Sequence, residues 1–178
     1  MTSPSVAGLP LAGSVGGPSG LGPDLVLTSH RDRALFNLAP FFTVADVDML
    51  QSRAARLGID ISIAAIDRPE DAVAVFPAAL PVLPLENRHE DAPGATNPAN
   101  AAGTIESIER ATRYALEGRA AALVTAPIEK KALYDAGFDH PGHTEFLAAL
   151  CQRHSGHSVQ PVMLLTGPEL SSVPVTIH

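Results

Sequence analysis

The feature that most constrains the fold of this chain is the alternation of short apolar runs with amphipathic stretches along its 178 residues. Runs such as Leu11–Val15, Phe41–Val44 and Leu80–Leu85 have the length and composition of buried strands. Between such runs, apolar residues recur at helical spacing. This order is typical of βα units, in which parallel strands form a sheet with helices on its faces. We therefore predict an α/β protein with a mostly parallel sheet.

Capping residues indicate where several of these elements begin and end. Asp46 is a good N-cap for a helix that runs through Leu57, and Gly58 is expected to stop it. Asn97-Pro98 precede the longest expected helix, and Gly118 follows it. The segment 67–79 is ambiguous. Further expected elements are a helix from Pro23 toward Leu38, strands at 59–66 and 120–124, a short helix from Pro127 to Gly137, a helix at 145–153 with Thr144 as its N-cap, and strands at 162–166 and 173–177.

Composition excludes several classes of protein. Hydrophobic residues make up 46% of the chain, which argues against intrinsic disorder. A net charge of −7 and only 4% aromatic residues argue against a nucleic-acid partner. We see neither an apolar run of about 20 residues nor a basic signal peptide, so no membrane partner is expected. Cys151 is the one cysteine, which fits a reducing compartment. The expectation is a cytoplasmic protein.

A glycine-rich segment, residues 16–22, follows the first expected strand; we call it the glycine loop. Glycines allow backbone N–H groups to approach an anion, and the helix that follows adds a partial positive charge. The segment lacks the Lys-Ser/Thr of a P-loop, and its G-x-x-G-x-G spacing differs from the dinucleotide fingerprint. The residues leave open whether this loop binds an anion or is only a tight turn.

A second candidate site is the corner Pro141–Phe146, in which Gly142 precedes His143 and Thr144. Backbone N–H groups at a helix start suit a phosphate or a carboxylate, so His143 and Thr144 are candidate substrate-binding residues. The alternative is a capped helix that carries an incidental histidine.

Histidine is a common metal ligand, and His178 closes an expected strand at the position where α/β sheets bind ligands. It is a candidate metal ligand, although a single histidine is also consistent with a structural role. His154 and His157 are expected to be surface residues at a helix end. Cys151 is expected to be packed rather than nucleophilic.

Taken in order, the motifs resemble the N-terminal half of the 4-hydroxythreonine-4-phosphate dehydrogenase family, the PdxA-type enzymes of pyridoxal phosphate (vitamin B6) biosynthesis. The resemblance covers nearly the whole chain. The matching strings are GPSGLGPD at 17–24, NPANA at 97–101, LVTAPI at 123–128, KALYDAG at 131–137 and PGHTEF at 141–146.

The resemblance implies a fold like that of isocitrate and isopropylmalate dehydrogenases, with two α/β domains, a cleft between them and a homodimeric assembly. It implies an oxidoreductase that uses NAD or NADP to oxidise 4-phosphooxy-L-threonine, followed by decarboxylation to 3-amino-2-oxopropyl phosphate. His143 and Thr144 match the family's substrate-binding pair. His178 matches the first of three histidines that hold a divalent metal, which would be zinc, magnesium or cobalt. We assign no general base and no cofactor-binding residue.

Members of this family are longer than the present chain. We therefore expect residues 1–178 to be the N-terminal portion of a two-domain dehydrogenase, truncated so that the C-terminal half is absent, and to show no NAD reduction in isolation. One alternative is a paralogue that oxidises a 4-phosphorylated sugar acid, such as threonate or erythronate 4-phosphate. The other alternative is a catalytically inactive fragment that at most binds a ligand or a partner.

Overall fold

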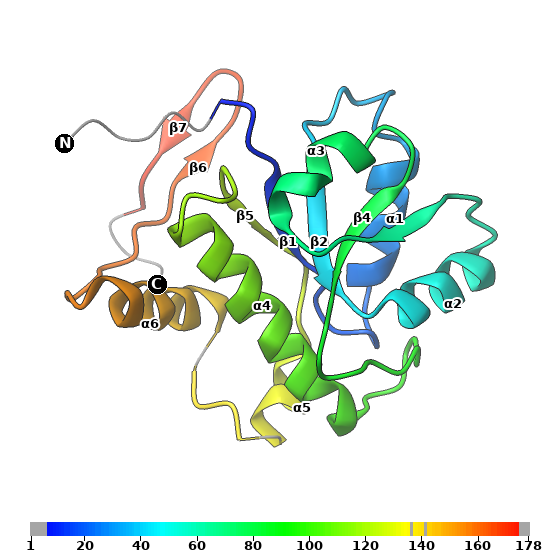
Figure 1. Cartoon of the computed structure of the whole chain (residues 1–178). Helices are drawn as coiled ribbons and strands as arrows, with labels where there is room; N and C mark the ends of the chain where they lie inside the picture. Colours follow the sequence, from blue (N-terminus) through cyan, green and yellow to red (C-terminus); the bar gives the residue numbers. More distant parts are fainter. Residues whose placement is uncertain (1–6, 136, 141, 175–178) are drawn as a thin grey trace. The chain divides into compact units, whose positions relative to one another are not determined.

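The computed structural model describes residues 7–135, 137–140 and 142–174, which form two compact units, Met1–Asp139 and His140–His178. The first unit is built on a five-stranded sheet with strand order β3-β4-β2-β1-β5 (Figure 1). Its elements are β1 (Leu11–Ser14), α1 (Gly22–Arg31), β2 (Phe41–Ala45), α2 (Val47–Leu57), β3 (Ile63–Ala65), η1 (Pro69–Asp71), α3 (Ala72–Val75), β4 (Leu80–Pro84), η2 (Pro98–Asn100), α4 (Ala101–Leu116), β5 (Leu123–Thr125) and α5 (Lys130–Asp135).

All neighbouring strands of this sheet are parallel. β1 lies between β2 and β5, and β4 lies between β2 and β3. Every connection between two of these strands contains a helix, as parallel pairing requires. The prediction of an α/β fold with a mostly parallel sheet is confirmed.

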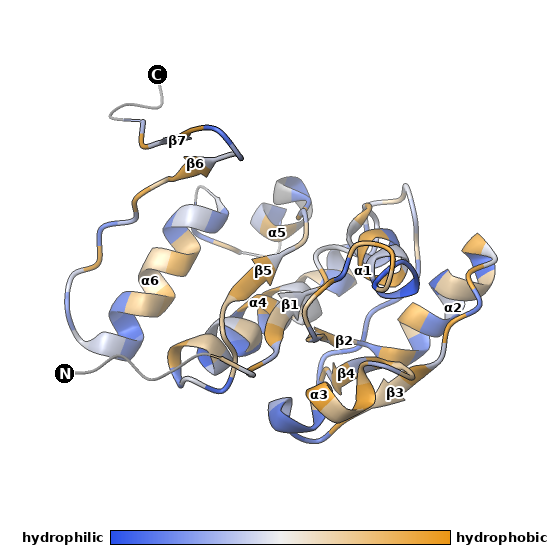
Figure 2. Ribbon diagram, turned by 90° about the horizontal axis from the view of Figure 1, so that it is seen from above, coloured by the Kyte–Doolittle hydropathy of each residue, from blue (hydrophilic) through white to orange (hydrophobic). Residues whose placement is uncertain are grey.

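Each face of the sheet contributes to a separate apolar core. On one face, Phe42 and Val44 of β2 pack in a cluster with Ala111 and Tyr114 of α4. On the other face, Ala45 of β2 belongs to a cluster that includes residues of α1 and α2. The alternation of side chains along a strand produces this division. Because β2 is buried on both faces, its residues are apolar apart from Thr43. Strand β5 of the same sheet is likewise coloured as hydrophobic in Figure 2.

The caps of α2 follow the prediction. The Oδ1 atom of Asp46 accepts a hydrogen bond from the backbone N–H of Met49 at 3.1 Å, and Gly58 ends the helix with a φ of 64°. The longest helix is also confirmed, as η2 followed by α4. Asn97 caps its start by accepting from the N–H of Ala99 at 3.0 Å.

Several predicted boundaries were wrong. Helix α1 ends at Arg31 rather than near Leu38, because a series of turns follows it and Asn37 has a positive φ. Strand β3 covers only part of 59–66, and β5 lies further along the chain than 120–124. The short helix begins at Lys130 rather than Pro127, because the carbonyl of Pro127 accepts a hydrogen bond from Gly17 and ties this segment to the glycine loop.

Within its described residues, the second unit contains one helix, α6 (His143–Ser155), and a hairpin of β6 (Leu165–Thr166) and β7 (Ser171–Ser172). Thr144 is not the N-cap: the extended Gly142 is, so α6 begins earlier than predicted. The strand expected at 162–166 shortens to β6. The strand expected at 173–177 is replaced by β7, because Gly167 donates to the carbonyl of Leu170 and closes the hairpin there; residues 175–177 lie outside the described part of the chain.

Candidate functional site

The loops that follow β1, β2 and β4 gather at the carboxyl edge of the parallel sheet. From β2 the chain passes to α2 on one face, and from neighbouring β4 it passes to α4 on the other face. Such a change of direction between adjacent strands marks the usual position of a ligand crevice in open α/β sheets. The glycine loop and the segment 85–97 therefore form the first candidate site.

Packing within the chain explains two glycines of the glycine loop. Gly16 has a φ of +73°, and a Cβ atom there would collide with the carbonyl of Pro127. A Cβ atom at Gly22 would collide with the carbonyl of Val15. Gly17 and Gly20 are different, because an added Cβ would come no closer than 3.8 Å and 3.7 Å, respectively, to its nearest neighbour. The tight-turn interpretation thus accounts for Gly16 and Gly22, but not for the other two.

A buried arginine on α2 fixes the conformation of this loop. The side chain of Arg53 is 1% exposed, and its guanidinium donates hydrogen bonds to the carbonyls of Pro18 and Gly20. The same group donates to the carboxylate of Asp24 and, from Nε at 2.7 Å, to Asp91. Because Asp91 belongs to the segment 85–97, one cation joins both loops of the site.

Further contacts hold the segment 85–97 against the glycine loop and against Glu129, the residue that precedes α5. The N–H of Gly94 donates to the carbonyl of Ser19 at 2.8 Å. The hydroxyl of Thr96 donates to the carboxylate of Glu129. Between these contacts lies a small hollow at the carboxyl edge. Its lining residues are Gly17, Pro18, Ser19, Asn97, Asn100, Ala101, Thr104, Glu129 and Leu133.

Asp46 and His89 form a buried polar pair beside this hollow. The Oδ2 atom of Asp46 accepts a hydrogen bond from the backbone N–H of His89 at 3.1 Å. Burial lowers the pKa of His89 to about 4, although the negative charge of Asp46 opposes the shift. Nearby, burial tends to raise the pKa of Glu106, but hydrogen bonds from the N–H groups of Glu86 and Asn87 and from Arg110 lower it to about 2. His89 is therefore neutral and Glu106 ionised near pH 7.

The predicted substrate-binding pair lies in the second unit. His143 is the first residue of α6 and is half-buried, while Thr144 is the next residue and is exposed. The first-turn N–H groups of a helix have no partner within that helix, so this corner is suited to an anion. His154 and His157 are exposed, as predicted. His178 lies outside the described residues, so its approach to His143 and Thr144 stays a prediction.

The described part of the chain contains no group of three or more His, Cys, Asp or Glu side chains that could hold a metal ion. These residues do not form the predicted metal site by themselves. Within the same part of the chain, no helix is both long and apolar enough to cross a bilayer.

Arg53, Asp91 and His89 were not predicted as site residues from the sequence. A signal for Arg53 was present, because it occupies a position between Leu50 and Ala54 on the apolar face of α2. A charged residue at such a position requires a buried partner. Asp91 and His89 lie in a polar loop, and their burial depends on tertiary contacts that carry no local pattern.

The fold and the loops at its carboxyl edge define an α/β protein with an open parallel sheet. Residues 37–178 match the model of the family described as "Pyridoxal phosphate biosynthetic protein PdxA". The chain belongs to this family.

Relatives and solved structures agree with this assignment. The chain is 46% identical over 171 residues to a 4-hydroxythreonine-4-phosphate dehydrogenase of Methylorubrum populi, a match that covers 95% of this chain and 49% of the relative. A protein of the same name from Methylorubrum extorquens is 44% identical, and this match also covers 95% of this chain and 49% of the relative. The crystal structure of 4-hydroxythreonine-4-phosphate dehydrogenase from Klebsiella pneumoniae superposes with a TM-score of 0.76 at 30% identity, covering 93% of this chain and 50% of that one. The chain thus spans about half the length of the proteins it matches.

Proposed function

We propose that this chain is the N-terminal part of a dehydrogenase that oxidises 4-phosphooxy-L-threonine with NAD or NADP in vitamin B6 biosynthesis. The oxidised product then loses CO₂ to give 3-amino-2-oxopropyl phosphate. The observation that carries the proposal is the 46% identity, across 95% of the chain, to a relative named 4-hydroxythreonine-4-phosphate dehydrogenase. The family resemblance extends the proposal to a homodimer in the cytoplasm and to a divalent metal, zinc, magnesium or cobalt, with His178 as one ligand.

His143 and Thr144 would bind the anionic substrate at the start of α6. Thr144 is exposed, so its hydroxyl is accessible to a ligand, and the helix start adds a partial positive charge. His143 would supply a second polar group beside it. In this proposal both residues bind and orient the substrate, and neither is assigned the role of a general base.

The test uses a chimera in which residues 1–178 are continued by the part of the Methylorubrum populi dehydrogenase that follows the matched region. Reduction of NAD and of NADP is measured with 4-phosphooxy-L-threonine, threonate 4-phosphate and erythronate 4-phosphate. We expect the highest kcat/KM with 4-phosphooxy-L-threonine. A preference for either sugar acid would identify a paralogue instead.

The control is the unmodified Methylorubrum populi dehydrogenase under the same conditions. If the relative turns over 4-phosphooxy-L-threonine and the folded chimera turns over none of the three substrates, this chain is an inactive fragment and the proposal is wrong.

A further inference from the structure

The hollow at the carboxyl edge of the sheet has one charged side chain among its described lining residues, the half-buried carboxylate of Glu129. One oxygen of this carboxylate accepts a hydrogen bond from the hydroxyl of Thr96. Lys131, two residues further along the chain, donates to Asp135 at 2.7 Å rather than to Glu129. Within the described side chains, no salt bridge therefore neutralises the carboxylate in the hollow.

The other polar side chains of the hollow donate hydrogen bonds within the chain. The amide group of Asn97 donates to the carboxylate of Glu90 at 2.8 Å, and that of Asn100 donates to the carbonyl of Glu90 at 3.0 Å. The hydroxyl of Thr104 donates to the carbonyl of Asn100 at 2.9 Å. A carboxylate only accepts hydrogen bonds, and a hydroxyl has a single hydrogen to donate. The lining therefore favours a ligand that donates hydrogen bonds.

The size of the hollow limits what it can hold. Its volume is about 10 Å³, which is the space of one water-sized group. An added Cβ at Gly17 would come no closer than 3.8 Å to its nearest neighbour, the backbone nitrogen of Glu129. Packing within the chain does not require this glycine, and its missing side chain leaves space beside Glu129. An ammonium group fits such a space, whereas a nicotinamide ring does not.

The charge of the hollow argues against a phosphate group in it. No cationic side chain belongs to its described lining. Arg53 lies beside the hollow, but its guanidinium is already paired with the carboxylates of Asp24 and Asp91. A phosphate would lose hydration and lie against the carboxylate of Glu129 without a cationic partner. The hollow is suited to a cation.

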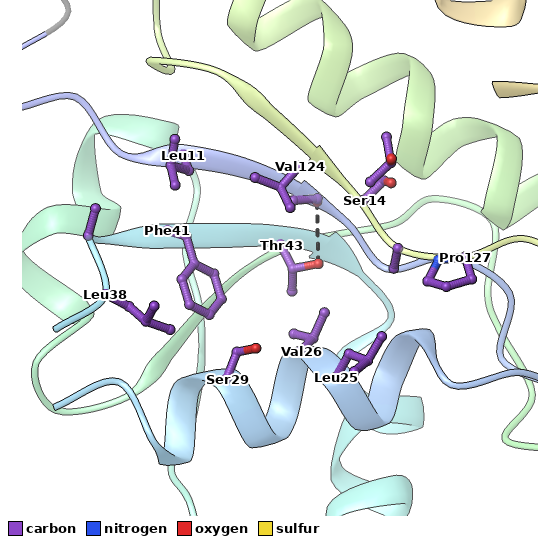
Figure 3. A pocket seen from close by; sticks show the side chains of 14 residues that line it. Leu11, Ser14, Leu25, Val26, Ser29, Leu38, Phe41, Thr43, Val124 and Pro127 are labelled. Atoms are coloured by element: carbon purple, nitrogen blue, oxygen red, sulfur yellow. Dashed lines mark hydrogen bonds between the residues drawn. The ribbon is translucent and has the colours of Figure 1, made fainter. Parts of the chain in front are cut away.

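A larger cavity between α1 and the sheet lacks this chemistry (Figure 3). It has a volume of about 360 Å³, and no charged side chain belongs to its described lining. Its polar side chains are hydroxyl groups, and that of Thr43 donates to the carbonyl of Gly13 at 3.3 Å. An ammonium group placed there would lose its hydration without gaining a carboxylate.

We infer that the hollow binds the α-ammonium group of an amino-acid substrate, with Glu129 as its counter-ion. An ammonium group has three donors and no acceptor, which matches the lining. The inference rests on the proposed function and deepens it, because 4-phosphooxy-L-threonine carries this group, whereas threonate and erythronate 4-phosphate carry a hydroxyl in its place. Glu129 is then the residue that favours the amino acid over the sugar acids.

The test measures the Kd of 4-phosphooxy-L-threonine and of threonate 4-phosphate for the chimera described above, by isothermal titration calorimetry. Glu129→Gln removes the charge but retains an oxygen that can accept from Thr96. It should raise the Kd of 4-phosphooxy-L-threonine by roughly tenfold or more, because the ammonium group loses its ionised partner. The Kd of threonate 4-phosphate should change by less than about twofold, since a hydroxyl does not need that charge.

The control is Glu117→Gln, which removes the same charge at the opposite end of α4. Glu117 is exposed and does not line the hollow, so neither Kd should change. A second variant, Thr96→Val, removes the hydroxyl that orients Glu129 and should weaken the binding of 4-phosphooxy-L-threonine to a smaller extent. The thermal midpoint of each variant shows whether it is folded.

Three results would overturn the inference. In the first, Glu129→Gln changes the affinity for both ligands equally, or for neither. In the second, the folded chimera does not bind 4-phosphooxy-L-threonine. In the third, potassium in place of sodium tightens the binding of both ligands and Glu129→Gln abolishes this effect, which would assign the hollow to an inorganic cation.

The turnover of the chimera is measured separately from these affinities. If the chimera binds 4-phosphooxy-L-threonine through Glu129 but reduces neither NAD nor NADP with it, the proposed function is wrong and the ammonium site remains. If the chimera oxidises 4-phosphooxy-L-threonine and Glu129→Gln leaves the preference between the two ligands unchanged, the proposed function stands and the ammonium site is wrong.

Discussion

The guanidinium of Arg53 is buried among four oxygen acceptors, two from carbonyls of the glycine loop and two from the carboxylates of Asp24 and Asp91. Arg53→Met should lower the free energy of unfolding by about 3–5 kcal/mol, because it leaves carboxylates without their buried cation. Arg56 is a matched control: it contacts the same Asp91 at 3.1 Å, but its side chain is 55% exposed. Arg56→Met should cost less than about 1 kcal/mol. Urea denaturation of both variants measures the difference, and equal losses would contradict the role given to Arg53.

His89 makes the stability of the chain depend on pH. Its pKa is about 4 in the folded state, because burial disfavours the charged imidazole, whereas the pKa of an unperturbed histidine is 6.5; the unfolded state therefore binds more protons between these values. The contribution of neutral His89 to the free energy of unfolding is therefore complete above pH 6.5, and it decreases as the pH falls toward 4. Between pH 6.5 and 4.5 we expect a loss of ~2 kcal/mol. Glu106 has a pKa of about 2, so its own contribution to stability is lost only below pH 4.5, outside this window.

Replacing His89 with Asn should remove most of this dependence. The control is His154→Asn, which changes an exposed histidine and should leave the slope intact. The measurement is the urea midpoint at intervals from pH 7 to pH 4.5. An unchanged slope in His89→Asn would show that another group causes the pH dependence.

At the scale of elements, the glycine loop offers a direct test of which glycines the fold requires. Gly22 is the first residue of α1, and a Cβ atom there would collide with the carbonyl of Val15. Gly22→Ala should therefore destabilise the chain by more than about 2 kcal/mol. Gly20→Ala is the matched control, since its Cβ would lie 3.7 Å from the nearest atom, and it should cost less than about 1 kcal/mol. Thermal unfolding of both variants gives the comparison. Similar losses at the two positions would show that backbone crowding does not distinguish them.

Elements with local signals could be predicted from the sequence. Asp46 and Gly58 bound α2 because their capping chemistry acts within a few residues. The start of α5 could not be predicted in this way, because Pro127 is held by the distant Gly17 rather than by its own helix. His143 and Thr144 were proposed as substrate-binding residues from their motif, and this role stays a prediction. Arg53 and Asp91 were missed, because their pairing joins residues that are far apart in the chain.

At the scale of the molecule, the five-stranded unit contains the glycine loop and its Arg53 clamp, while the His143–Thr144 corner opens α6 in the second unit. Both lie in a chain that spans about half of each relative it matches. In the dehydrogenase that we propose, the remaining site residues would come from polypeptide beyond this matched half.

The proposed binding of the anionic substrate by His143 and Thr144 is tested most directly by the KM of the chimera for 4-phosphooxy-L-threonine. Thr144→Val and His143→Asn should each raise this KM by roughly tenfold, the cost of a hydrogen bond to a charged group, and should leave the KM for the nicotinamide cofactor unchanged. Gln152→Ala, an exposed position later on α6, is the control and should change neither value. An unchanged KM for 4-phosphooxy-L-threonine in both site variants would contradict the assignment of this corner to the substrate.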